Sequence, residues 1–106
     1  MTYEEADAIL KMHGREVKKL QYYTFLTRRN DNMAINYHGT DVITFRPNGE
    51  IILNPGGWFS RTTKARINEY SPLKVTSIKG EWFINDVHFK ERMMILKDGK
   101  VSQHIS

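Results

Sequence analysis

Apolar residues recur at helical spacing near the start of the chain. Thr2 followed three residues later by Glu5 is the signature of a capping box, in which the two side chains accept free backbone amides at a helix start. Gly14 is suited to the left-handed conformation that closes a helix. The pattern therefore predicts a helix over residues 3–13.

Two endings of this helix fit the pattern. Val17 and Leu20 continue the apolar stripe, so a longer helix would pass through Gly14 at a cost of about 1 kcal/mol for the glycine. His13 lies at the edge of the stripe, and we interpret it as a partly buried residue, since histidine is intermediate in burial.

From residue 21 onward the pattern is typical of short strands, with aromatic and β-branched residues between turn-forming residues. Alternation places Met33, Ile35 and Tyr37 on the core face of one strand and His38 on the other face. Apolar residues fall on both faces of the strand over residues 40–46, which indicates a strand covered on both sides. The predicted strands are residues 22–27, 33–38, 40–46, 50–54, 73–78, 81–85, 88–96 and 100–105.

A second, short helix is predicted after Pro55-Gly56-Gly57, which interrupts strand pairing. Thr62 or Thr63 can cap its start. Ile67 belongs to its apolar stripe, and Pro72 ends it.

These elements predict an α+β fold with one antiparallel sheet of about six short strands, the N-terminal helix and the short second helix. A partly closed β-barrel with a flanking helix is the alternative. The connections are too short for parallel strand pairs. With 106 residues, the chain fits a single domain over residues 1–106.

Composition narrows the function classes. Sixteen Lys and Arg against twelve Asp and Glu give a net charge of +4, which favours polyanionic partners. The chain has no cysteine, which excludes disulfides, thiolate zinc sites and a cysteine nucleophile. Acidic residues interrupt the first twenty positions, and no apolar run approaches the roughly 18 residues that span a bilayer. We expect a soluble cytoplasmic protein without membrane contact.

Four stretches of the sequence carry a family resemblance: Tyr37-His38-Gly39-Thr40-Asp41-Val42, Arg46-Pro47-Asn48-Gly49, Gly56-Gly57-Trp58 and Thr62-Thr63-Lys64-Ala65-Arg66-Ile67-Asn68. In these stretches, about a third of the chain, the sequence resembles a group of small uncharacterised phage and prophage proteins. The resemblance implies a phage origin, a shared fold and a location in the host cytoplasm. It carries no catalytic residues across.

The segment Arg61-Thr62-Thr63-Lys64-x-Arg66 is a candidate anion site. A helix start offers free amides and a positive dipole end, and here two hydroxyls and three cations surround it, as in phosphate sites. The alternative is that a threonine caps the helix while the cations remain solvated.

Trp58, beside two glycines, is a candidate for stacking on a base, with a core anchor as the alternative. Arg28 and Arg29 could both extend the basic surface only if they lie in a turn, because neighbouring residues on a strand point to opposite faces. The candidate nucleic-acid site is therefore Trp58, Arg61, Thr62, Thr63, Lys64 and Arg66.

Catalytic and metal signals are weak. His38 and Asp41 are close enough in sequence to pair for acid–base work, but no nucleophile motif or phosphate loop accompanies them. The four histidines lack metal-ligand spacing. We expect no enzyme activity, no metal and no cofactor.

Two functional hypotheses follow. In the first, the protein is a phage accessory factor that binds nucleic acid through backbone phosphates with low sequence specificity. In the second, it is a phage inhibitor or adaptor that binds a host protein through a sheet edge or an aromatic patch such as Trp82-Phe83. The oligomeric state is left open, since a strand over residues 101–106 would suit either an ordered edge or pairing with another copy.

Overall fold

The computed structural model describes residues 1–103. Its helices are α1 (Tyr3–His13) and α2 (Arg61–Tyr70). Its strands are β1 (Val17–Gln21), β2 (Thr24–Arg29), β3 (Asn32–Tyr37), β4 (Thr40–Phe45), β5 (Ile51–Leu53), β6 (Thr76–Ile78), β7 (Glu81–Ile84), β8 (Val87–Phe89), β9 (Met93–Ile95) and β10 (Val101–Ser102).

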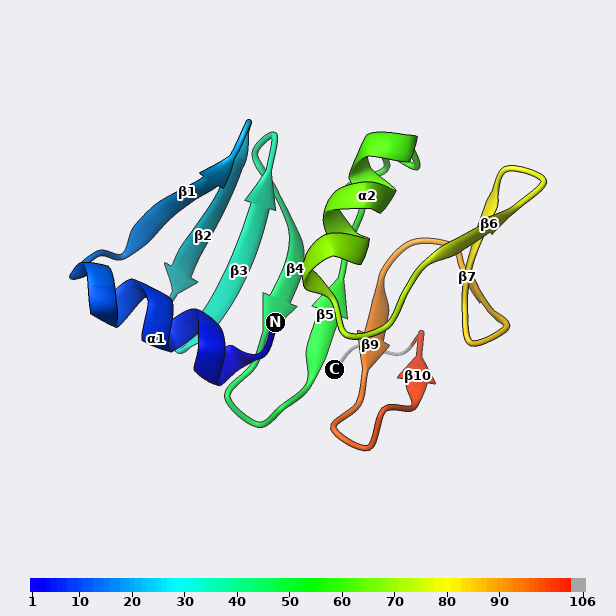
Figure 1. Cartoon of the computed structure of the whole chain (residues 1–106). Helices are drawn as coiled ribbons and strands as arrows, with labels where there is room; N and C mark the ends of the chain where they lie inside the picture. The colour runs from blue at the N-terminus through cyan, green and yellow to red at the C-terminus, as the bar shows by residue number, and fades with distance from the viewer. Residues whose placement is uncertain (104–106) are drawn as a thin grey trace.

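Seven strands form one antiparallel sheet in the order β1-β2-β3-β4-β5-β9-β10. The chain leaves this sheet after β5, forms α2 and the three-stranded sheet β6-β7-β8, and returns as β9 beside β5. Figure 1 shows both helices on the same face of the large sheet, which does not close on itself. The predicted α+β class is confirmed, and the barrel alternative is wrong.

The first helix has the predicted limits. The Thr2 hydroxyl accepts the Glu5 amide at 3.2 Å, and Gly14 adopts φ 61° with its amide donating to the Leu10 and Lys11 carbonyls. The longer helix is therefore wrong: the following residues form β1, whose backbone pairs with β2. His13 is exposed rather than partly buried, because it is the last residue of the helix and lies beyond the buried Ala6 and Leu10.

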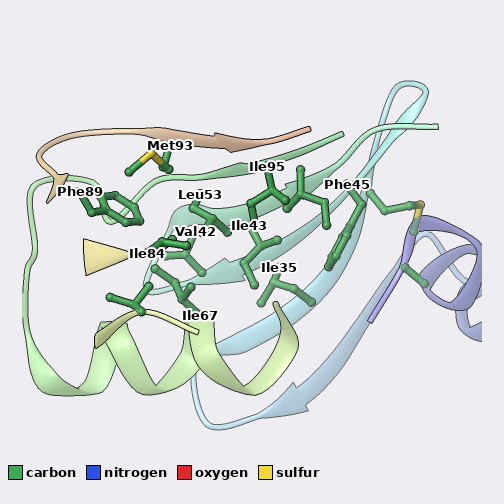
Figure 2. Close-up of a cluster of buried hydrophobic side chains, with 14 of the residues drawn as sticks. Ile35, Val42, Ile43, Phe45, Leu53, Ile67, Ile84, Phe89, Met93 and Ile95 are labelled. Atoms are coloured by element: carbon green, nitrogen blue, oxygen red, sulfur yellow. The ribbon is translucent and has the colours of Figure 1, made fainter. Parts of the chain in front are cut away.

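The core is an apolar ladder on the helix-facing side of the large sheet. Residues directly opposite one another on five neighbouring strands are Leu26, Ile35, Ile43, Leu53 and Met93. Leu10 of α1 is fully buried in the same cluster. So is Ile67 of α2 (Figure 2). Such burial stabilises by about 1.5–3 kcal/mol for each large side chain.

A β-bulge in β4 corrects the prediction of a strand covered on both sides by large apolar residues. Ile35 pairs with Ile43 and Asn36 pairs with Asp41, so Val42 is the extra residue. Val42 and Ile43 consequently belong to the same core cluster, and Val42 lies between the sheet and α2 (Figure 2).

The small sheet and the C-terminal region also differ from expectation. The predicted strand over residues 88–96 is two strands, β8 and β9, in different sheets. Trp82 is only 3% exposed, so the proposed Trp82-Phe83 surface patch is wrong for its larger member. Of the predicted strand over residues 100–105, β10 is present at the edge of the large sheet, and residues 104–106 lie outside the described residues.

Candidate nucleic-acid interface

Three connections meet at one end of the large sheet: the β1–β2 turn, the β3–β4 turn and the β5–α2 loop (Figure 1). A cleft of about 350 Å³ lies here. It is lined by Tyr37, His38, Thr40, Val42, Pro55, Trp58, Ser60, Thr62 and Thr63. Three of the four stretches that carried the family resemblance therefore converge, whereas residues 46–49 form the turn between β4 and β5 at the opposite end.

Glycine is required where the β5–α2 loop crosses β4. A Cβ atom on Gly56 would lie 2.8 Å from Cγ2 and 2.9 Å from Oγ1 of Thr40. Gly56 also has φ +65°, and its amide donates to the Asn54 side-chain oxygen at 2.9 Å. The amide of Trp58 donates to the Pro55 carbonyl at 3.1 Å. The two hydrogen bonds shape the loop, and the glycine lets it pass close to Thr40 at the cleft wall.

Trp58 is 71% exposed, so its alternative interpretation as a core anchor is wrong. The adjacent Phe59, itself 41% exposed, contacts the small sheet instead. Its ring meets Trp82 edge-on at 4.9 Å between centroids and Phe89 at 6.3 Å. With Phe59 held by the small sheet, the indole of Trp58 remains on the surface at the cleft.

The turns opposite Trp58 carry further aromatic rings. Tyr23 and His38 stack with centroids 4.4 Å apart and an interplanar angle of 18°. Tyr22 meets Tyr23 edge-on at 4.4 Å, and Tyr37 meets His38 edge-on at 4.5 Å. Tyr23 and His38 have positive φ angles, which are uncommon for large residues and frequent at turns and functional sites.

Sequence reasoning placed Tyr22 and Tyr23 inside a strand and did not include them in the site. Tyr22 and Tyr23 are themselves the two residues of the turn between β1 and β2, and their aromatic character fitted a strand pattern equally well. The proposed pairing of His38 with Asp41 does not form. Asp41 instead accepts from Arg29 at 3.0 Å and from Asn36 at 2.8 Å.

The cap of α2 is Ser60, not Thr62 or Thr63, because the helix begins two or three residues earlier than predicted. The Ser60 hydroxyl accepts the Thr63 amide at 3.2 Å and donates to the Thr63 hydroxyl at 2.9 Å. Thr63 is buried and occupied by these bonds, whereas Arg61 and Thr62 are exposed. The helix start is thus capped internally but not covered by neighbouring chain.

The predicted cations divide into two kinds. Arg61 is exposed and Lys64 half-buried, and neither side chain forms a hydrogen bond or ion pair with any residue in the described part of the chain. Arg66 is engaged: its Nε donates to the Thr24 hydroxyl at 3.1 Å, and its guanidinium lies 5.4 Å from the Tyr37 ring centroid. The residues that line the cleft include no carboxylate.

Arg28 and Arg29 do not extend the site, since both lie within β2 and point to opposite faces. Arg28 binds Asp7 of α1 at 2.7 Å and Glu16 at 3.2 Å. The hydrogen bond from Arg28, followed by one from Lys11, holds the pKa of Asp7 below its ordinary value.

The chain matches the family model of the Kyanoviridae Gp96 protein over residues 1–101. It belongs to this phage protein family. No curated protein matches the chain, and no solved structure matches it. The phage family expected from the resemblance is therefore confirmed. The motifs proposed for the group remain a prediction.

Within residues 1–103 of this family member, no three His, Asp or Glu side chains gather in a way that would hold a metal ion. No helix of the same residues is long and apolar enough to cross a membrane.

Proposed function

We propose that this protein is a small phage accessory factor that binds nucleic acid through backbone phosphates with low sequence specificity, in the cytoplasm of the infected cell. The observation that carries the proposal is a 71% exposed Trp58 that lines the cleft, followed at the start of α2 by two cations that have no partner among the described residues, Arg61 and Lys64. Phosphates and bases are the two chemical groups that such a surface recognises.

The charge distribution supports an anionic ligand. Helix α1 carries Glu4 and Glu5 in its first turn, where they oppose the positive end of the helix dipole. The first turn of α2 has no acidic residue and carries Arg61 and Lys64 instead. A bound phosphate would supply, at the positive end of the α2 dipole, the negative charge that Glu4 and Glu5 supply in α1.

Binding fits the site better than catalysis. His38 is stacked on Tyr23, and Asp41 is held by Arg29 and Asn36, so the candidate acid and base are turned to structural partners. We therefore propose that the protein is not an enzyme.

The test is fluorescence anisotropy with labelled oligonucleotides between about 50 and 200 mM salt. The variant Arg61→Ala/Lys64→Ala should weaken binding and lower the slope of log affinity against log salt. The slope should fall by up to about 1.8 for duplex DNA or about 1.4 for a single strand, since each phosphate contact contributes about 0.9 or 0.7. The matched control is Lys90→Ala/Arg92→Ala, which removes the same charge from the exposed β8–β9 connection. Absence of binding at low salt, or equal loss in both variants, would contradict the proposal.

A second candidate function is docking on a host protein by strand addition. Strand β6 is an edge of the small sheet, all three of its residues are exposed, and Ile78 is 58% exposed. An extended peptide can pair with such an edge. Capture of one stoichiometric host protein from nuclease-treated lysate, lost in Ile78→Asp, would support this function. Equal capture by the variant would count against it.

A further inference from the structure

We infer that the ligand is a single strand of nucleic acid and that one unpaired base enters the cleft beside Trp58. The inference rests on the proposed function and specifies which form of nucleic acid it concerns. It has three supports: the size of the cleft, the arrangement of aromatic rings around it, and the polar groups at its edge.

The cleft volume of about 350 Å³ is at the small end of the roughly 300–1,000 Å³ found for small-molecule pockets. This space suits one planar ring system and excludes a duplex. Aromatic residues line it from two sides, with Trp58 on the β5–α2 loop and Tyr37 and His38 at the β3–β4 turn. A base can present its face to these rings only when it is unpaired and unstacked, because in a duplex both faces are covered by neighbouring bases.

The rings continue beyond the cleft. His38 lines the cleft and stacks on Tyr23, which is 48% exposed, and Tyr23 contacts Tyr22, which is 69% exposed. Aromatic residues that follow one another along a surface are the feature by which single-strand binders hold successive bases. A strand with one base at Trp58 can therefore place a neighbouring base against the Tyr22–Tyr23 turn.

The polar groups at the cleft suit a ligand that carries negative charge and base-edge donors. The Thr62 hydroxyl lines the cleft on the exposed side of α2. It lies 3.2 Å from the Ser60 hydroxyl, whose proton goes to Thr63, so Thr62 donates to Ser60 and keeps a lone pair to accept from a base edge. Arg66 borders the cleft through its contact with Tyr37. Its Nε is held by Thr24, whose own hydroxyl donates to the Tyr22 carbonyl at 2.9 Å, so one bonded chain links α2 to the aromatic turn.

This bonded chain leaves the guanidinium of Arg66 oriented before any ligand arrives. Its two terminal nitrogens donate to no acceptor in the described part of the chain. They are therefore positioned to donate to a phosphate beside the stacked base, in the forked geometry that arginine uses for phosphates. Base stacking at Trp58 and phosphate contact at Arg66 would act on the same nucleotide step.

The test compares four ligands of equal length: single-stranded DNA, single-stranded RNA, duplex DNA, and an abasic strand that keeps the phosphates but lacks the bases. Anisotropy gives the affinities, and intrinsic fluorescence reports on Trp58, because the second of the two tryptophans, Trp82, is buried. The inference predicts that at least one of the two intact single strands binds roughly 5- to 140-fold tighter than the abasic strand, with quenching of Trp58 emission.

The variant Trp58→Ala should remove that difference without changing the affinity for the abasic strand, and Trp58→Phe should restore part of it. Because Trp58 is exposed, neither variant removes a core contact. If the intact single strands, the duplex and the abasic strand bind equally, or if Trp58→Ala weakens all of them alike, this inference is overturned while the phosphate-binding function stands. If none of the four binds at low salt, the proposed function itself fails.

Discussion

Replacing Gly56 by alanine tests how the loop and β4 build the cleft. A Cβ atom at this position would lie 2.8 Å from Cγ2 and 2.9 Å from Oγ1 of Thr40. Both atoms branch from one Thr40 Cβ, itself 3.4 Å away, so a change of rotamer cannot remove both contacts. Gly57 provides the matched control, because it also has a positive φ, +84°, but a Cβ there would meet nothing within 4 Å.

The two substitutions separate backbone strain from steric overlap. Gly57→Ala should cost about 1–2 kcal/mol, the strain of a left-handed conformation for alanine. Gly56→Ala should cost about 2–5 kcal/mol, because overpacking adds about 1–3 kcal/mol to the same strain. In the Thr40→Ala background both γ atoms are gone and only an ordinary contact with Cβ remains. The cost of Gly56→Ala should there fall to that of Gly57→Ala.

Urea denaturation of the four proteins in the Gly56/Thr40 cycle, together with Gly57→Ala, measures these differences. The account predicts a coupling free energy of about 1–3 kcal/mol between positions 56 and 40. Equal destabilisation by Gly56→Ala and Gly57→Ala, or a Gly56→Ala cost that Thr40→Ala does not reduce, would refute the contact between the loop and β4.

Three further predictions concern the helices. Ser60→Ala should lower the free energy of unfolding, measured by urea denaturation, by about 0.5–2 kcal/mol through loss of the α2 cap. Ser60→Asp should keep the cap but weaken oligonucleotide binding, measured by anisotropy, because it places a carboxylate at the cleft. Ile67→Ala should cost about 2–5 kcal/mol in the same denaturation assay, because the side chain is fully buried. Asp7→Asn should lower the melting temperature near pH 7, since it removes the partner of Arg28, and the difference from the wild type should narrow as the pH falls below about 4.

The sign of the pH effect follows from the lowered pKa of Asp7 in the folded state. Its contribution is complete above the ordinary pKa and is lost as the pH falls through the folded-state value. A constant difference in melting temperature between Asp7→Asn and the wild type from pH 7 to pH 3 would contradict this pH dependence.

A Ser60→Ala protein as stable as the wild type would show that another group caps α2. A cost below about 1 kcal/mol for Ile67→Ala would contradict close packing at that site.

Features set by neighbouring residues could be predicted from the sequence. The limits of α1 follow from Thr2 and Gly14, and the Pro47-Asn48-Gly49 turn lies between two strands as expected. Strand β1 was missed because Val17 and Leu20 fit a helical phase as well as a strand, and only pairing with β2 decides between them.

The site was predicted in part, for a similar reason. A helix start was expected at residues 61–66 and is present there, but the cap is Ser60, two or three residues before the predicted one. Thr63 is buried, and Arg66 has partners in β2 and β3. The exposure of Trp58 depends on Phe59 packing against Trp82, a contact between residues distant in the chain that no local pattern contains.

The central claim is that nucleic acid binds at the cleft between the β3–β4 turn and the start of α2. Its most direct test is an NMR titration of ¹⁵N-labelled protein with a short single-stranded oligonucleotide at low salt. The measured quantities are the chemical shifts of the backbone amides and of the Trp58 indole N–H. The account predicts saturable shifts at residues 37–40 and 56–63. Shifts confined to β6–β8, or none at low salt, would contradict it.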